Sequence, residues 1–254
     1  MMFSCSVVKY VLTAALRDRL IMALALLLVV GASLSIFLGS AAISEPDQFA
    51  VVFAAGGLRL AGAMGLILFI VFYLRRSFES RDVDFLLSRP ISRTSFLISH
   101  SVAFAILAMI VAFCVFVTVC AISPHNIESG HWLWAFSILA EYIMIANVSL
   151  FFAMVLPNAA AGTLAVFGLY LLARMMGQIL GIIESGIPGA SLHILGTIMH
   201  GISLIIPRFD LMGQTSWLVY GEGDITYTFI LIQGIAFSAL ALLAALTDLT
   251  RKQF

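Results

Sequence analysis

The sequence predicts an all-α, polytopic membrane protein with six transmembrane helices and both termini in the cytoplasm. Of its 254 residues, 62% are apolar and only 10% are charged, against about 45–50% and 25% in a soluble domain. The charges are bunched between long uncharged stretches, and the formal net charge is zero, so no surface for polyanions is indicated. These observations exclude a soluble enzyme, a nucleic-acid binder and a disordered chain.

Residues 1–19 predict an amphipathic helix. A projection at 100° per residue places the apolar residues on one side and the polar residues on the other. The apolar side holds Phe3, Val7, Val8, Val11, Leu12 and Ala15, and the polar side holds Ser6, Lys9, Thr13 and Arg17. We expect an interfacial helix along the inner membrane surface that leads into the first span; a frayed tail is the alternative.

The first two spans are predicted from the positions of the charges. No charge occurs between Arg19 and Glu45, and Ile21–Leu38 fits a first span. Residues 39–42 resemble a signal cleavage region, but the long apolar core and the residues before it favour an uncleaved helix. Only fifteen uncharged residues separate Arg59 from Arg75, about 22 Å of helix, which is too short to cross. The second span must therefore begin near Phe49 and contain Arg59.

Four further spans follow in the chain: Phe96–Ile122, Trp132–Leu156, Ala159–Leu180 and Thr226–Leu246. A further apolar segment, Ile187–Ile206, is interrupted by glycine and proline. With six spans, ten of the thirteen basic residues lie inside: Lys9, Arg17, Arg19, Arg75, Arg76, Arg81, Arg89, Arg93, Arg251 and Lys252. A seventh span would put Arg251 and Lys252 outside, against the positive-inside rule. We therefore expect residues 181–225 to be an outer insertion with a re-entrant or surface-lying helical pair.

The inner loop at residues 75–95 has the highest charge density in the chain. Asp82 or Asp84 can cap a short helix at Val83–Ser88, Pro90 would end it, and Ser92 can cap the third span. That short helix exposes Phe85, Leu86 and Leu87 among charges, so it needs an apolar pocket on another molecule. The alternative is that it rests on the membrane surface while the arginines set the topology.

This loop resembles that of the ABC-2 type permeases, the membrane subunits of ABC exporters. The matching residues are Glu79, the pair Leu86-Leu87 and the run Pro90-Ile91-Ser92-Arg93. The resemblance extends to the N-terminal helix, the six spans, the outer insertion and the basic C-terminal end.

The resemblance implies one permease domain over residues 1–254 that forms a translocation path in the bacterial cytoplasmic membrane. It implies a second permease chain, either identical in a homodimer or related in a heterodimer, and contact with membrane lipid. It also implies a separate ATP-binding-cassette ATPase subunit docked on a coupling helix. The coupling residues carried over are a docking element, made of Glu79 and the short helix Val83, Asp84, Phe85, Leu86, Leu87 and Ser88, and two arginines close to it, Arg89 and Arg93.

The chain has no ATP site of its own by sequence. A phosphate-binding P-loop needs a lysine after a glycine, and neither Lys9 nor Lys252 follows one. We therefore expect no enzyme activity and no cofactor, with energy supplied by a partner or by an ion gradient. A stand-alone ion-coupled carrier or channel remains the alternative function.

Three ionisable residues fall inside predicted spans, where a charge is costly and marks a functional site by default. They are Arg59, Glu141 and Arg174, at about 15, 14 and 9 Å from the outer ends of their helices. We expect Glu141 to neutralise Arg59 or Arg174, either near the substrate route or as a buried pair that only fixes helix packing. His125, Glu128 and His131 lack a fourth ligand, so we expect no metal site.

Overall fold

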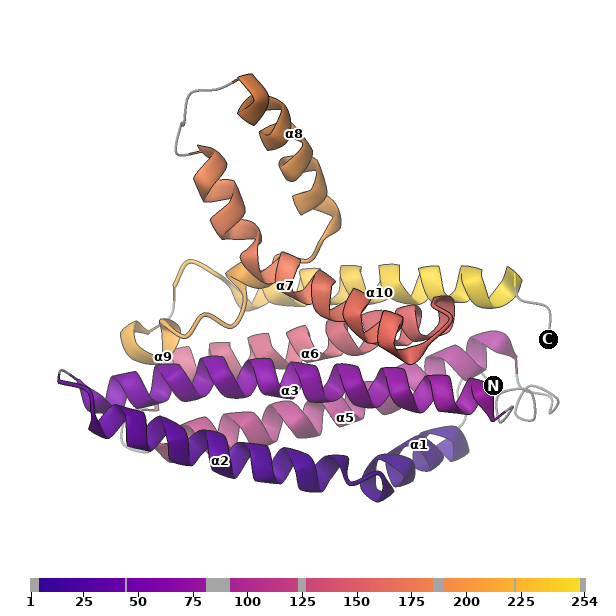
Figure 1. Ribbon diagram of the computed structural model, residues 1–254, viewed down its shortest axis with the longest axis horizontal. Coiled ribbons are helices and arrows are strands. Elements are labelled where there is room, and N and C mark those ends of the chain that lie inside the picture. Colours follow the sequence, from indigo (N-terminus) through magenta and orange to yellow (C-terminus); the bar gives the residue numbers. More distant parts are fainter. Residues whose placement is uncertain are drawn as a thin grey trace.

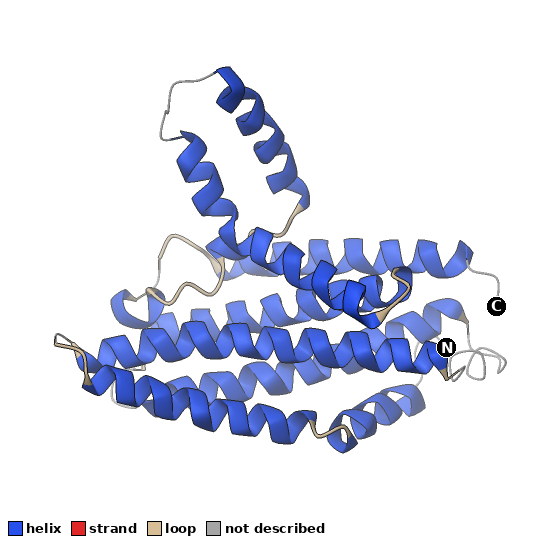
Figure 2. Ribbon diagram, in the orientation of Figure 1, coloured by secondary structure: helices blue, strands red, loops and turns tan. Residues whose placement is uncertain are grey.

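The computed structural model describes residues 5–43, 45–80, 92–122, 127–184, 190–221 and 223–251. Of these described residues 88% are helical, and they contain no strand (Figure 2). The elements in chain order are α1 (Cys5–Arg17), α2 (Leu20–Ser40), α3 (Pro46–Glu79), α5 (Arg93–Ile122), α6 (Ser129–Val155), α7 (Ala159–Glu184), α8 (Ala190–Ile205), the 3₁₀ turn η1 (Phe209–Leu211), α9 (Trp217–Tyr220) and α10 (Tyr227–Arg251).

Six of the described helices are long and apolar enough to cross a membrane: α2, α3, α5, α6, α7 and α10. In Figure 1 most of them run side by side along the long axis of the molecule, and both termini lie at the same end. An even number of spans requires that placement of the termini. The prediction of an all-α, six-span membrane protein is therefore confirmed.

Helix α3 explains how Arg59 comes to lie within a span. The helix has 34 residues, about 51 Å at 1.5 Å per residue, well beyond the roughly 30 Å hydrocarbon layer. It begins with Pro46, whose fixed φ suits the first turn of a helix, three residues before the expected start at Phe49. Its inner end, with Arg75, Arg76 and Glu79, therefore extends towards the cytoplasm.

The core of the bundle lies among α3, α5 and α6, which pack on one another. Its fully buried side chains include Ile70, Phe104, Trp134 and Tyr142. Helices α2 and α10 cover this core and leave apolar side chains exposed on their outer faces; Phe37, for example, is 68% exposed. Such faces suit a lipid environment.

The predicted N-terminal helix is present as α1, and most of its apolar side packs on protein. Val7, Val8, Val11 and Ala15 are buried, and α1 contacts α5. Burial of each valine contributes roughly 1.5 kcal/mol. The expected amphipathic helix is therefore present, and its apolar side packs on the bundle.

Within the segment Ile187–Ile206, where a helical pair was expected, the described residues form one continuous helix, α8. Helix α8 runs from Ala190 to Ile205 through Gly196 and Gly201, because glycine in an apolar helix weakens it without ending it. The expectation of a helical pair within Ile187–Ile206 is wrong in this respect. Helix α8 packs on α7, and Figure 1 shows α8 and the later part of α7 projecting together from the side of the bundle.

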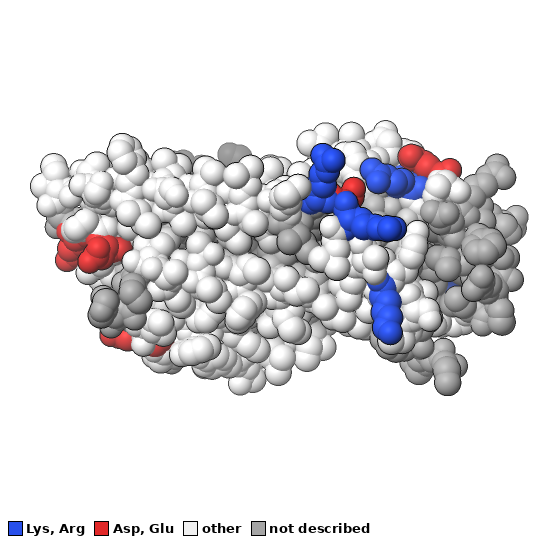
Figure 3. Space-filling model, turned by 90° about the horizontal axis from the view of Figure 1, so that it is seen from below, with Lys and Arg blue, Asp and Glu red and all other residues white. Residues whose placement is uncertain are grey.

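Charges separate between the two ends of the bundle. Figure 3 shows basic side chains gathered towards the end that carries both termini, with fewer acidic ones among them, and acidic side chains at the opposite end. By the positive-inside rule, the end with the termini is cytoplasmic.

This orientation predicts which positions a membrane-impermeant maleimide reaches in intact cells. With Cys5, Cys114 and Cys120 replaced by serine, we expect labelling of an Asp224→Cys variant, because position 224 is exposed at the outer end. We expect an Arg251→Cys variant to be labelled only after the cells are permeabilised. Labelling of position 251 in intact cells would contradict the six-span orientation.

Candidate functional site

Three charged side chains from three helices meet inside the bundle. Arg59 of α3, Glu141 of α6 and Arg174 of α7 form this cluster. The Nε atom of Arg59 lies 4.0 Å from Oε1 of Glu141, and Nη1 of Arg174 lies 3.7 Å from Oε2. The predicted neutralisation of Glu141 is therefore observed, with both arginines rather than one.

The cluster is buried to different degrees. The side chain of Glu141 is inaccessible, and those of Arg59 and Arg174 are 9% and 21% exposed. Transfer of one unpaired carboxylate from water into such a site would cost many kcal/mol. Two guanidinium groups beside it offset that cost by charge attraction and leave one positive charge in excess.

Backbone carbonyls of the outer insertion balance that excess charge. We call residues 206–221 the outer cap segment. Nη1 of Arg59 donates to the carbonyl of Gly213, and Nη1 of Arg174 donates to the carbonyls of Phe209 and, at 2.6 Å, Met212. Hydrogen bonds from charged donors are about twice as strong as neutral ones. The arginines thus join the spans to the outer cap segment.

Two tyrosine hydroxyl groups also donate hydrogen bonds at the cluster, whereas Nε of Arg59 and Oε2 of Glu141 have no hydrogen-bond partner among the described residues. The hydroxyl of Tyr170 donates to Oε1 of Glu141 at 3.0 Å. The hydroxyl of Tyr142 donates to the backbone carbonyl of Arg59 at 2.9 Å. A side chain at Gly62 would collide with that hydroxyl, so glycine at position 62 lets α3 and α6 approach each other here.

Gly213 is the point where the outer cap segment enters the site. Its φ is +57°, a left-handed conformation that favours glycine. A Cβ atom there would lie 2.8 Å from Nη1 of Arg59 and 3.4 Å from Oε2 of Glu141. Its N–H donates to Oγ of Ser137 at 2.7 Å. Both the backbone conformation and the space require glycine.

The later part of the outer cap segment, at α9 (Trp217–Tyr220), is held by a second set of contacts. Trp217 and Leu218 of α9 are buried, and α9 packs on α6. A side chain at Gly130 of α6 would collide with the carbonyl of Trp217, so the two backbones approach closely. The outer cap segment is therefore fixed at its turn and at its short helix.

The predicted coupling residues are described only in part. Val83, Asp84, Phe85, Leu86, Leu87, Ser88 and Arg89 lie outside the described residues. Glu79 is the last residue of α3. Ser92 caps α5, as expected, by accepting a hydrogen bond from the N–H of Ser95 at 3.1 Å.

Arg93 connects the end of the inner loop to the last span. Its Nη1 donates to the carbonyls of Leu249 at 2.7 Å and of Thr250 at 3.1 Å. Both belong to the last turn of α10, whose carbonyls have no partner within the helix. The guanidinium of Arg93 therefore caps α10.

Two more arginines fasten the other side of the inner loop. Nη2 of Arg75 donates to the carbonyl of Pro157 in the turn between α6 and α7. Nη1 of Arg76 lies 3.7 Å from Oδ1 of Asp18, at the end of α1. Both flanks of the inner loop are thus bonded to neighbouring elements.

The two described members of the histidine-rich outer loop have a structural role. The N–H of Glu128 donates to Nδ1 of His131 at 3.3 Å, and the two side chains form a capping box at the start of α6. Within the described ranges, His, Cys, Asp and Glu form no group that could hold a metal ion.

Sequence reasoning did not identify Tyr142, Tyr170, Ser137 or the outer cap segment as parts of the site. Two of these residues had a usable signal. Ser137 precedes Glu141 by four residues and Tyr170 precedes Arg174 by four, so each lies on the same helix face as its charged neighbour. No pattern in residues 206–221 indicated that their carbonyls enter the bundle.

No family model matches the chain, and no curated protein matches it.

We expect a Glu141→Gln substitution to lower the free energy of unfolding by about 3–5 kcal/mol, because it leaves the buried Arg59 and the partly buried Arg174 without a counter-charge. Thermal unfolding followed by tryptophan fluorescence in detergent measures the effect. Asp224→Asn, at an exposed outer position, is the control and should change stability by less than about 0.5 kcal/mol. Equal stability of the two variants would show that Glu141 does not stabilise the fold.

A Gly213→Ala substitution should destabilise the protein by about 1–3 kcal/mol, because alanine is strained at this φ and its Cβ would press on Arg59. Gly168→Ala is the matched control, since nothing lies within 4 Å of a Cβ there and alanine favours a helix. The same unfolding experiment compares them. A neutral Gly213→Ala variant would contradict the described approach of the turn to the cluster.

Proposed function

We propose that this chain is the permease subunit of an ABC exporter, paired with a second permease chain and driven by a separate ATP-hydrolysing subunit. The proposal rests on the resemblance of the inner loop at Glu79 and at residues 83–93. It requires that a movement of this loop reaches the spans.

The observation that carries the proposal is the bonding of both flanks of the loop. On one side, Arg75 and Arg76 bond to the α6–α7 turn and to the end of α1. On the other side, Arg93 bonds to the end of α10. A force on the loop would therefore act on three other elements at once, which suits a mechanical coupling element.

The contacts of the outer cap segment, at the outer end of the bundle, also support an exporter function. The Glu141 cluster holds the outer cap segment across α3, α6 and α7, so relative movement of these helices would strain its hydrogen bonds. An exporter must open its outer end to release a substrate, and this segment is a suitable gate. Local unfolding of such elements is a common source of functional motion.

A second copy of the chain would supply the other half of the path. Helix α8 and the later part of α7 project from the bundle (Figure 1) and expose apolar side chains such as Ile182, Ile198 and Ile205. Apolar faces of this kind suit either lipid or another permease chain.

Co-purification with the ATPase subunit tests the proposal. We expect a P-loop ATPase encoded by a neighbouring gene to purify in stoichiometric amount with the tagged chain in mild detergent. A Leu86→Glu/Leu87→Glu variant should lose at least nine-tenths of that subunit, because two buried carboxylates would prevent apolar docking. A Tyr220→Glu variant is the control, since it adds a carboxylate at an exposed outer position.

Arg93 provides a second arm of the same experiment. Because its guanidinium caps α10, we expect an Arg93→Gln variant to keep the ATPase subunit and to lose thermal stability. A chain that purifies without any ATPase, or that keeps the ATPase after the double leucine substitution, would contradict the proposed function and favour a carrier that works alone.

A further inference from the structure

We propose that this chain binds an anionic phospholipid of the inner leaflet, with the headgroup between α1 and α3 and the acyl chains in a crevice between α2 and α3. The site lies within a single chain, so its occupancy does not depend on an ATPase partner. It is separate from the Glu141 cluster, which lies in the outer half of the spans.

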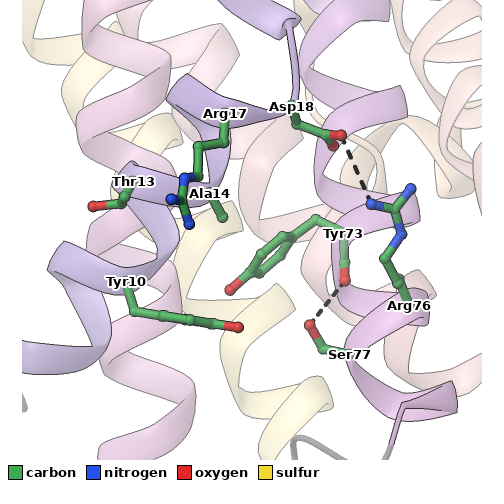
Figure 4. Close-up of a pocket in the computed structure, with 8 residues that line it drawn as sticks. All are labelled: Tyr10, Thr13, Ala14, Arg17, Asp18, Tyr73, Arg76 and Ser77. Carbon is green, nitrogen blue, oxygen red and sulfur yellow. Dashed lines mark hydrogen bonds and ion pairs between the residues drawn. The ribbon is translucent and has the colours of Figure 1, made fainter.

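The headgroup site is a cavity of about 430 Å³ at the cytoplasmic end of the bundle. Its walls are the polar side of α1 and the inner end of α3. The residues that line it are Tyr10, Thr13, Ala14, Arg17, Asp18, Tyr73, Arg76 and Ser77. Figure 4 shows Tyr10 and Tyr73 pointing into the space between the helices, with Arg17 on the α1 side and Arg76 on the α3 side.

The charges in this cavity fit a phosphate group. The lining holds two arginines, Arg17 and Arg76, and one carboxylate, that of Asp18, so it carries one net positive charge. Arg17 forms no ion pair with the described residues. The ion pair of Arg76 and Asp18 spans 3.7 Å between exposed side chains, and such pairs contribute little in water. Both guanidinium groups are therefore available to a phosphate, the anion that they recognise best.

The crevice for the acyl chains is an apolar cavity of about 350 Å³. It lies between α2 and α3, with Val111 of α5 as a further wall, and its α3 side includes the small residues Ala61 and Gly65. Nothing lies within 4 Å of a Cβ atom built on Gly65. The lining is almost entirely apolar, as acyl chains require.

The packing of α2 on α3 explains why the crevice faces the inner leaflet. Nearer the outer end the helices touch, since a side chain at Gly39 would collide with Ala50 and one at Gly31 would press on Leu58. Farther in, at Gly65, that contact is absent among the described residues. The two helices therefore separate towards the cytoplasm.

One stripe of α3 connects the crevice to the headgroup cavity. Gly65, Leu68, Phe72 and Arg76 follow one another at intervals of three and four residues, so they share one face of the helix. Leu68 and Phe72 are 43% and 49% exposed. An apolar path thus leads directly to a basic site at the inner membrane surface. This order matches a phospholipid, whose apolar acyl chains are joined to a charged phosphate headgroup. Free phosphate would use the basic site alone.

Native mass spectrometry of the full chain in detergent tests this site. The probes are palmitoyl-oleoyl phosphatidylglycerol, the matching phosphatidylcholine, glycerol 3-phosphate and inorganic phosphate. We expect the phosphatidylglycerol to bind at least tenfold more tightly than the phosphatidylcholine. An Arg17→Gln/Arg76→Gln variant should weaken its binding roughly 25-fold, about fivefold for each arginine, whereas Arg251→Gln should leave it unchanged.

The crevice is tested by a Gly65→Leu variant, which places a side chain in the open space between α2 and α3. We expect it to weaken binding of both lipids at least tenfold, while Gly168→Leu, at another open glycine, has no effect. Equal binding of the two lipids, unaffected by either lining variant, would overturn the proposal. Glycerol 3-phosphate or inorganic phosphate could instead displace the phosphatidylglycerol while the Gly65→Leu substitution leaves lipid binding unchanged. That result would overturn the proposal in favour of a soluble phosphate ligand.

Discussion

The buried carboxylate of Glu141 is the constraint on which the outer half of this molecule depends. A carboxylate that is inaccessible to water needs positive charge beside it, and α3 and α7 each supply an arginine. The two arginines lie 4.0 and 3.7 Å from the carboxylate, as ion pairs without hydrogen bonds, so their N–H donors need other acceptors. The outer cap segment provides them with its backbone carbonyls. One acidic residue in α6 thus determines how three spans and an irregular outer segment fit together.

The same chemistry recurs at the cytoplasmic end, without a buried acid. Arg75 and Arg93 each donate to backbone carbonyls that a turn or a helix end leaves without a partner. At both ends of the bundle, arginine therefore joins one element to the exposed backbone of another. Such bonds are directional and strong where water is scarce. These hydrogen bonds fix the positions of the loops relative to the spans in a chain that has few charges. Packing of apolar surfaces is not directional and does not fix those positions by itself.

The sequence predicted the six spans because charge-free stretches of sufficient length are a direct consequence of the hydrocarbon layer. It also predicted that Glu141 meets Arg59 or Arg174, since three charges at similar depths in apolar helices have few other partners. It did not predict that the outer cap segment enters the site, because backbone carbonyls leave no signature in side-chain patterns. The continuous course of α8 was missed for a related reason: glycine weakens a helix by an amount that its surroundings can offset.

The most direct measurement of the central constraint is amide hydrogen exchange in detergent, compared between the natural chain and a Glu141→Gln variant. If the cluster holds the outer cap segment, residues 209–220 should exchange at least tenfold faster in the variant, above all at Gly213, whose N–H bonds to Ser137. The inner ends of α3 and α5, some 20 Å or more away along the helices, should exchange at the natural rate. Unchanged exchange in residues 209–220, or a uniform rise across the whole bundle, would contradict the account.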